Sequence, residues 1–436
     1  MRPDLPTAAA AGADFQSQTG LDCKITRVGS SAPYPIFLPK VFPIQDTFPF
    51  RRLRPGHWHG AVFVLLALVV FPGSKVQAFE YLDSLEQGSM AMVFALVYSA
   101  ASGTVDFAIP GSDGPVLRRL DLETLEVVDE RVLTGFPRGT RFLIRHPDAD
   151  RLYIFLFPAS TDLESEPILL ELQQSDWEVL RELELSSEGA AASVAPDGTH
   201  LYISQQIDGH AGLVKVDLEK FTIVDQLIFQ YGSDWIMDMA MDMVMDSSGN
   251  ALWVGLGEGE SAFYPDYSGL FKVDLETFSA TPVSTGNSAH VMYPSLALSL
   301  DGETLWAYSS ERGIFGSGGD ATHLVGVNTD TLAIEADIEL PNGYRAWKSL
   351  ALDPDPERDY AYLASWDSGG SWLRVDLGNN ELIDQISYSE GYFAFYHRPV
   401  FIDDLVWYPG QSRISRLSLK PGVFFQDRFE VAAPED

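Results

Sequence analysis

The chain has 436 residues, of which 46% are hydrophobic and 12% aromatic, a composition that excludes intrinsic disorder and permits a large folded core. It carries 62 Asp and Glu residues against 29 Lys and Arg residues, a formal net charge of −33. Such an acidic surface repels nucleic acid and anionic membranes, so neither is expected as a partner. The single cysteine, Cys23, excludes disulfides within the chain and thiol chemistry after residue 23.

Residues 1–78 are expected to be an N-terminal extension that ends in a signal peptide. Arginines at 51, 52 and 54 precede an apolar run at 61–71, and Val76-Gln77-Ala78 follows. This is the order of a secretory signal, with cleavage expected after Ala78. The run is shorter than the ~20 residues that cross a bilayer, although a membrane-anchored form stays open as an alternative. Residues 79–436 are thus expected to be exported, to the periplasm or beyond, without membrane insertion.

From Met90 onward one unit of four short strands recurs, and its clearest copy spans residues 190–227. There an apolar run meets the turn Pro196-Asp197-Gly198, an alternating strand follows, and a second hairpin closes between Asp217 and Phe221. We place the counterparts of Asp217 at 121, 171, 217, 274, 328, 376 and 418. Seven in-phase copies without a helical pattern predict an all-β fold, a seven-bladed β-propeller of four-stranded antiparallel blades.

The repeated motifs resemble those of the YVTN-type propellers, which are related to the quinoprotein amine dehydrogenase heavy chain and to lactonase-like propellers. The resemblance rests on Pro-Asp-Gly-x-x-Leu-Tyr-Ile at 196–203 and Val-x-Val-Asp-Leu-Glu at 214–219, and it extends over residues 90–431. It implies the fold and leaves the function open, because such propellers include binding proteins, enzymes and enzyme subunits. The tryptophan-anchoring repeat expected of propellers that carry pyrroloquinoline quinone is missing, so no cofactor is expected.

Five methionines alternate along residues 237–245, so a strand there would place all five on one face. Thioethers can bind Cu(I) in an oxidising compartment. Packing between blades is the interpretation we favour, because this segment is predicted to be an innermost strand and Met fills irregular gaps. The opposite register puts Asp238 and Asp242 on one face, where they could cap a turn, pair with an arginine or join a cation site.

The connections from the outer strand of one blade to the inner strand of the next are the predicted binding site, because they converge on the central channel. They hold aromatic side chains together with a few arginines, histidines and an aspartate. Arginine could clamp an anionic or sugar-like ligand there, whereas the alternative is that aromatics plug the channel and arginines pair with carboxylates. The candidate ligand-binding residues are Arg141, Asp234, Trp235, His290, Tyr344, Arg345, His397 and Arg398.

The chain carries no nucleophile elbow, zinc-protease motif or phosphate loop in a credible context. Its six histidines after residue 78 have no ligand spacing, so no catalytic residue and no metal site is assigned; Ca²⁺ in the long loops 255–269 and 309–321 stays open. The leading hypothesis is an exported, soluble, monomeric scaffold that binds a small ligand or a protein without catalysis. The alternative is a lactonase-like or amine-dehydrogenase-like enzyme, or enzyme subunit, that uses the same channel.

Overall fold

All described parts of the chain are strands and the turns that join them. The chain divides into two compact units, Met1–Phe71 and Pro72–Asp436, and the described residues belong to the second. Within them no helix is long and apolar enough to cross a membrane. The computed structural model describes residues 80–86, 94–136, 139–158, 166–187, 189–231, 234–235, 240–256, 269–283, 292–310, 322–341, 349–364, 371–387, 398–409 and 413–419.

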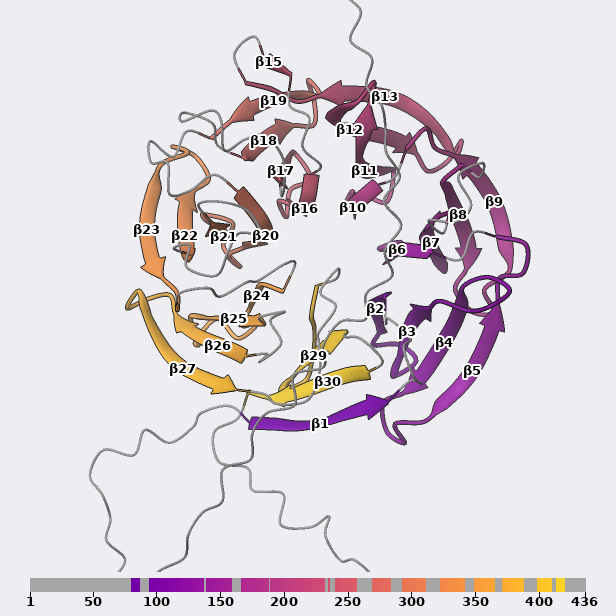
Figure 1. Cartoon of the computed structure of the whole chain (residues 1–436), viewed down its shortest axis with the longest axis horizontal. Helices are drawn as coiled ribbons and strands as arrows, with labels where there is room; N and C mark the ends of the chain where they lie inside the picture. Colours follow the sequence, from indigo (N-terminus) through magenta and orange to yellow (C-terminus); the bar gives the residue numbers. More distant parts are fainter. Residues whose placement is uncertain are drawn as a thin grey trace, which may run out of the picture. The chain divides into compact units, whose positions relative to one another are not determined.

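Seven four-stranded antiparallel sheets stand in a ring around a central channel (Figure 1), which confirms the predicted propeller. From the channel outward, blade 1 consists of β2 (Phe94–Ser99), β3 (Thr104–Ile109), β4 (Val116–Asp121) and β5 (Val127–Val132). Blade 2 consists of β6 (Gly139–Arg145), β7 (Arg151–Phe157), β8 (Ile168–Gln173) and β9 (Val179–Glu184). Blade 3 consists of β10 (Gly189–Val194), β11 (His200–Ile207), β12 (His210–Asp217) and β13 (Thr222–Ile228). Blade 4 consists of β16 (Ala240–Met245), β17 (Ala251–Leu256), β18 (Leu270–Asp274) and β19 (Ser279–Pro282). Blade 5 consists of β20 (Met292–Leu298), β21 (Thr304–Ser310), β22 (Thr322–Asn328) and β23 (Ile334–Glu339). Blade 6 consists of β24 (Ala351–Leu352), β25 (Tyr360–Ala364), β26 (Ser371–Asp376) and β27 (Glu381–Ser387).

The seventh blade joins the two ends of the propeller. Its three inner strands come from the C-terminal part of the chain: β28 (Val400–Ile402), β29 (Leu405–Pro409) and β30 (Arg413–Ser418). Its outermost strand is β1 (Glu80–Glu86), which pairs antiparallel with β30. The sequence interpretation began the repeat at Met90 and did not foresee this strand, whose pairing leaves β30 without an open edge.

The turn between the third and fourth strand of a blade explains why the repeat shows an aspartate. Asp217 Oδ1 accepts a hydrogen bond from the backbone N–H of Lys220 at 2.8 Å, and Asp274 Oδ1 accepts one from that of Thr277 at 2.7 Å. The fifth residue of the turn takes a left-handed backbone, with φ of 54° at Phe221. A carboxylate in the first position holds the turn in that conformation by satisfying its N–H groups.

In blade 2 the counterpart of Asp217 is Gln173, which corrects our assignment of that place to Glu171. The N–H of Trp177 donates to Gln173 O at 2.7 Å, and Trp177 has φ of 57°. Glu171 lies two residues earlier, inside β8, where it is buried and paired with Arg181. The assignment failed because the apolar–acidic alternation that marks the true turns appears here two residues too early, at Leu170-Glu171-Leu172-Gln173.

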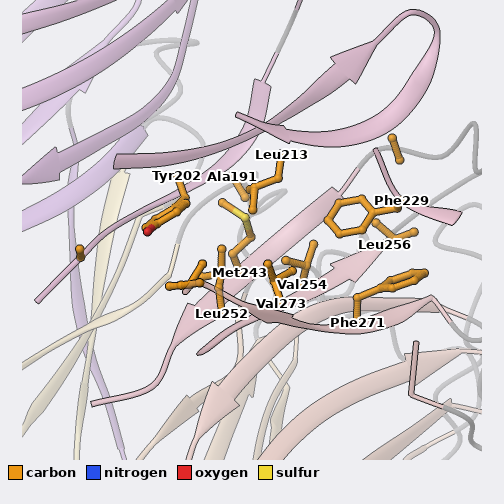
Figure 2. Packing of buried hydrophobic residues seen from close by; sticks show 13 residues of the cluster. Ala191, Tyr202, Leu213, Phe229, Met243, Leu252, Val254, Leu256, Phe271 and Val273 are labelled. Carbon is orange, nitrogen blue, oxygen red and sulfur yellow. The ribbon is translucent and has the colours of Figure 1, made fainter. Parts of the chain in front are cut away.

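Apolar side chains fill the spaces between neighbouring blades. At the contact of blades 3 and 4, Met243 of β16 is 3% exposed and packs with Ala191, Leu213 and Leu252 (Figure 2). Met243 therefore serves as a core residue, as the packing interpretation expects. The Met241 side chain and residues 237 and 239 lie outside the described residues.

Cationic side chains tie adjacent blades together at the same turns. Arg119 of β4 donates to the backbone carbonyls of 174 and 175 in blade 2, at 2.6 and 3.0 Å, and its guanidinium lies 4.6 Å from the ring centre of Trp177. Arg181 of β9 donates in the same way to the carbonyls of 218 and 219 in blade 3, both at 2.7 Å. Each bond satisfies a turn carbonyl and positions one blade against the next.

The turn aspartates should make the propeller lose stability in acid. The hydrogen bond from the Thr277 N–H lowers the pKa of Asp274, and the hydrogen bond from the Lys220 side chain lowers that of Asp217. A folded-state pKa below the unfolded one adds stability above the unfolded pKa, which is lost as the pH falls through the folded pKa. In Asp274→Asn, the free energy of unfolding measured with urea should therefore fall less steeply between about pH 5 and 3. Glu276→Gln, an exposed position in the same turn, is the control; an unchanged slope in Asp274→Asn would contradict the prediction.

Candidate functional site

The predicted channel-mouth residues fall into four groups. Arg141 lies within β6 rather than in the connection before it, and its guanidinium is 4.3 Å from the ring centre of Phe157. Asp234 and Trp235 form β15 (Asp234–Trp235), which pairs with β14 (Gln230–Tyr231) in a separate two-stranded hairpin. Arg398 lies in the described range 398–409, together with its side-chain contacts. His290, Tyr344, Arg345 and His397 lie outside the described residues, so a shared mouth for the whole set stays a prediction.

Arg398 joins two blades that are not neighbours in the ring. It precedes β28 of blade 7, and its Nε and Nη2 donate to Oδ1 of Asp242, on β16 of blade 4, at 3.2 and 3.1 Å. Nη2 also donates to the Met243 carbonyl at 2.6 Å. The Asp242 side chain is 5% exposed and that of Arg398 37%. Of the alternatives left open for Asp242, the structure thus shows pairing with an arginine.

Backbone groups hold Asp242 in place for this contact. Its Oδ1 also accepts the N–H of Met243 at 3.0 Å, and its Oδ2 accepts the N–H of Leu296, on β20 of the next blade, at 2.8 Å. Ser295 repeats this device one blade further, since its Oγ accepts the N–H of Leu350 at 2.9 Å. A carboxylate with every described neighbour donating to it is a rigid anchor for the arginine.

A cavity of about 300 Å³ opens beside Arg398 in the central channel. Its lining comes from the ends of the innermost strands β6, β10 and β16 and from the first turns of blades 2 and 3, which include Pro147 and Pro196. Most of the lining is Ala, Val, Ile, Pro and Met. Among the described lining residues the only charged ones are two arginines, Arg145 and Arg398.

Arg145 is the residue that the sequence interpretation missed. Its Nε is buried and has no hydrogen-bond partner among the described residues. Arg145 acts through its charge on Asp106, and this carboxylate is already bound by Arg119 at 2.7 Å. Burial nevertheless raises the pKa of Asp106, because desolvation outweighs those cations.

A signal for Arg145 was present in the repeat. It occupies the last position of the innermost strand, where blades 3, 4 and 5 carry Val194, Met245 and Leu298. A charge at a position that is otherwise apolar is informative. The binding residues predicted from the sequence come from the connections between blades, so they do not include this strand position.

A second cavity, of about 450 Å³, lies between blades 2 and 3, and its lining includes His146, Arg151 and His200. The His146 side chain serves the fold there. Its Nδ1 accepts the N–H groups of Asp148 and Ala149 at 3.1 and 2.9 Å, so its Nε2 carries the proton and donates to the Gly198 carbonyl at 3.0 Å. No group of acidic, His or Cys side chains in the described ranges is arranged to hold a metal ion.

Comparison with known proteins supports the architecture alone. No protein-family model and no curated protein matches the chain. It is similar to the solved β-propeller domain of Cps50 (Swd1) from Myceliophteria thermophila, with 14% identity, a TM-score of 0.56, and coverage of 78% of this chain and 99% of that one. The fold is that of a seven-bladed β-propeller. Hydrazine synthase from Kuenenia stuttgartiensis is also similar, with 12% identity, a TM-score of 0.54, and coverage of 76% and 97%.

Proposed function

We propose that this propeller is a non-catalytic binding scaffold that takes an anionic ligand in its central channel. The observation that carries the proposal is the pair Arg145 and Arg398, the only charged residues among the described lining residues of a cavity whose other described lining side chains are mostly apolar. A buried guanidinium nitrogen without a hydrogen-bond partner among the described residues, as at Arg145, carries a desolvation cost that the charge of a nearby anion would offset.

The surrounding charge makes the two arginines more significant. Arg398 is paired with Asp242, whereas no ion pair of Arg145 is found among the described residues, although the chain has a net charge of −33. Apolar walls reduce the effective dielectric constant around the guanidinium groups and so strengthen their attraction for an anion. Arginine also offers paired N–H donors that match carboxylate or phosphate oxygens. The enzymatic alternative gains no support at this cavity, since none of its described lining residues is a carboxylate or a histidine.

A screen of small anions by thermal shift tests the proposal. At least one carboxylate, phosphate or sulfate should raise the melting temperature in proportion to its occupancy, and Arg145→Gln should abolish the rise. Arg118→Gln is the matched control, because Arg118 carries the same charge in an exposed pair with Glu130 on blade 1. If no anion stabilises the protein, or if Arg145→Gln leaves the shift unchanged, the proposed site is wrong.

We also propose that the scaffold is exported as a monomer, and that the likeness of its repeats to the YVTN-type propellers reflects membership of that group. The order of segments in residues 51–78 supports export. Cleavage after Ala78 would remove no described strand, because β1 begins at Glu80. N-terminal sequencing of the purified protein decides the point, and a chain that retains residues 1–78 would overturn export.

A further inference from the structure

We propose that the ligand of the channel cavity is a small monocarboxylate with an apolar body, such as a carboxylic acid of about six to nine carbon atoms, the size that a cavity of this volume accepts. This inference rests on the proposed function and names the ligand class of the same site. The charge balance, the wall chemistry and the volume of the cavity each point to it independently.

The charges around the cavity match a ligand with a single negative charge. Arg398 is already neutralised by Asp242, which it contacts at 3.1 Å. Arg145 and Arg119 face one carboxylate between them, that of Asp106, which is bound to Arg119 at 2.7 Å. Among the described residues, these three arginines and two carboxylates therefore leave one positive charge. A phosphate, with a charge of about −1.5 to −2 at pH 7, would bring excess negative charge into a poorly solvated space, whereas a carboxylate would not.

The remaining walls favour an apolar body behind the carboxylate. Ile144, Val194 and Met245 are half-buried residues of the innermost strands that line the cavity, and Ser193 is the only uncharged polar residue among the lining residues. A sugar would leave its hydroxyl groups without partners against such walls, at a substantial cost for each. An alkyl or aryl body would instead remove these partly exposed apolar surfaces from water.

The volume sets the length of that body. A cavity of about 300 Å³ lies at the lower end of the range for small-molecule sites, and it corresponds to about ten water-sized atoms. Two of those are the carboxylate oxygens, which leaves room for about eight carbons, the carboxyl carbon included. Longer acids would have to project from the channel.

A series of carboxylic acids of increasing chain length tests the charge balance, the wall chemistry and the volume of the cavity together. Acetate, butyrate, hexanoate, octanoate and dodecanoate are titrated into the full chain and followed by ligand-observed NMR, beside inorganic phosphate and hexylamine. The Kd should fall about fourfold for each added methylene group until the cavity is full, and then level off. Arg145→Gln should weaken hexanoate by about tenfold or more, and Val194→Ser should reduce the gain in affinity per methylene group. Arg118→Gln should alter neither.

The outcomes separate the ligand class from the proposed function. If phosphate binds as tightly as hexanoate and depends on Arg145, the monocarboxylate is wrong and the anion-binding scaffold stands. The same holds if affinity depends on Arg145 but not on chain length. Binding of hexylamine as tight as that of hexanoate, or no Arg145-dependent binding of any compound, would overturn both.

Discussion

A chain that begins at residue 87 should melt about 10 °C or more below a chain that begins at residue 79. The shorter chain lacks β1, which pairs with β30 at six positions from Glu80↔Ser418 to Glu86↔Arg413. Ladder hydrogen bonds contribute about 0.5–1.5 kcal/mol each, and their loss also turns β30 into an open edge. Ile414 and Leu417 on that strand are 0% and 2% exposed, so the edge would present apolar side chains that promote aggregation.

A synthetic peptide that contains residues 79–88 provides the matched test of this closure. Added to the shorter chain, it should occupy the vacant position beside β30 and recover part of the lost melting temperature, as strand addition does elsewhere. A peptide of the same composition in scrambled order should have no effect. Equal melting temperatures of the two chains would mean that ring closure does not depend on β1.

The repeat was predictable because its turn chemistry is local. The turn at Pro196-Asp197-Gly198 and the hairpin at Asp217 each reveal themselves within a few residues, and their recurrence indicated seven blades. The strand β1 was not predictable in this way. Its partner β30 lies more than 300 residues away in the chain, and the pairing uses backbone groups that leave no distinctive sequence motif.

The site was predictable only in part, for a similar reason. Arg398 was selected for its place near the channel, and Asp242 was noted on the methionine-rich strand with an arginine as one possible partner. That these two residues meet depends on the ring, which brings blades 4 and 7 together across 156 positions of sequence. Arg145 was missed because a charge on an innermost strand becomes informative only once the channel is known to have a cavity beside it.

Breaking the pair Asp242–Arg398 should cost a substantial part of the stability of the propeller, because the Asp242 side chain is only 5% exposed. Asp242→Ala should lower the free energy of unfolding by about 3 kcal/mol, the low end for a buried pair because Arg398 keeps partial access to water. The N–H groups of Met243 and Leu296 would lose their acceptor in the same variant. Urea unfolding of Asp242→Ala, Arg398→Ala and the double variant gives the coupling energy of the pair.

The exposed pair Arg118–Glu130, at 2.7 Å, is the reference for this cycle, and its coupling should stay below about 1 kcal/mol. A coupling for Asp242–Arg398 no larger than that would show that the contact across the channel does not stabilise the ring.

The same pair links stability to binding. Asp242→Asn keeps an acceptor for Leu296 while adding one positive charge beside the cavity, so this variant should bind phosphate more tightly relative to hexanoate than the natural protein does. If the ratio of the affinities for phosphate and hexanoate is unchanged, the charge on Asp242 does not determine whether the site prefers an anion with one negative charge or with two.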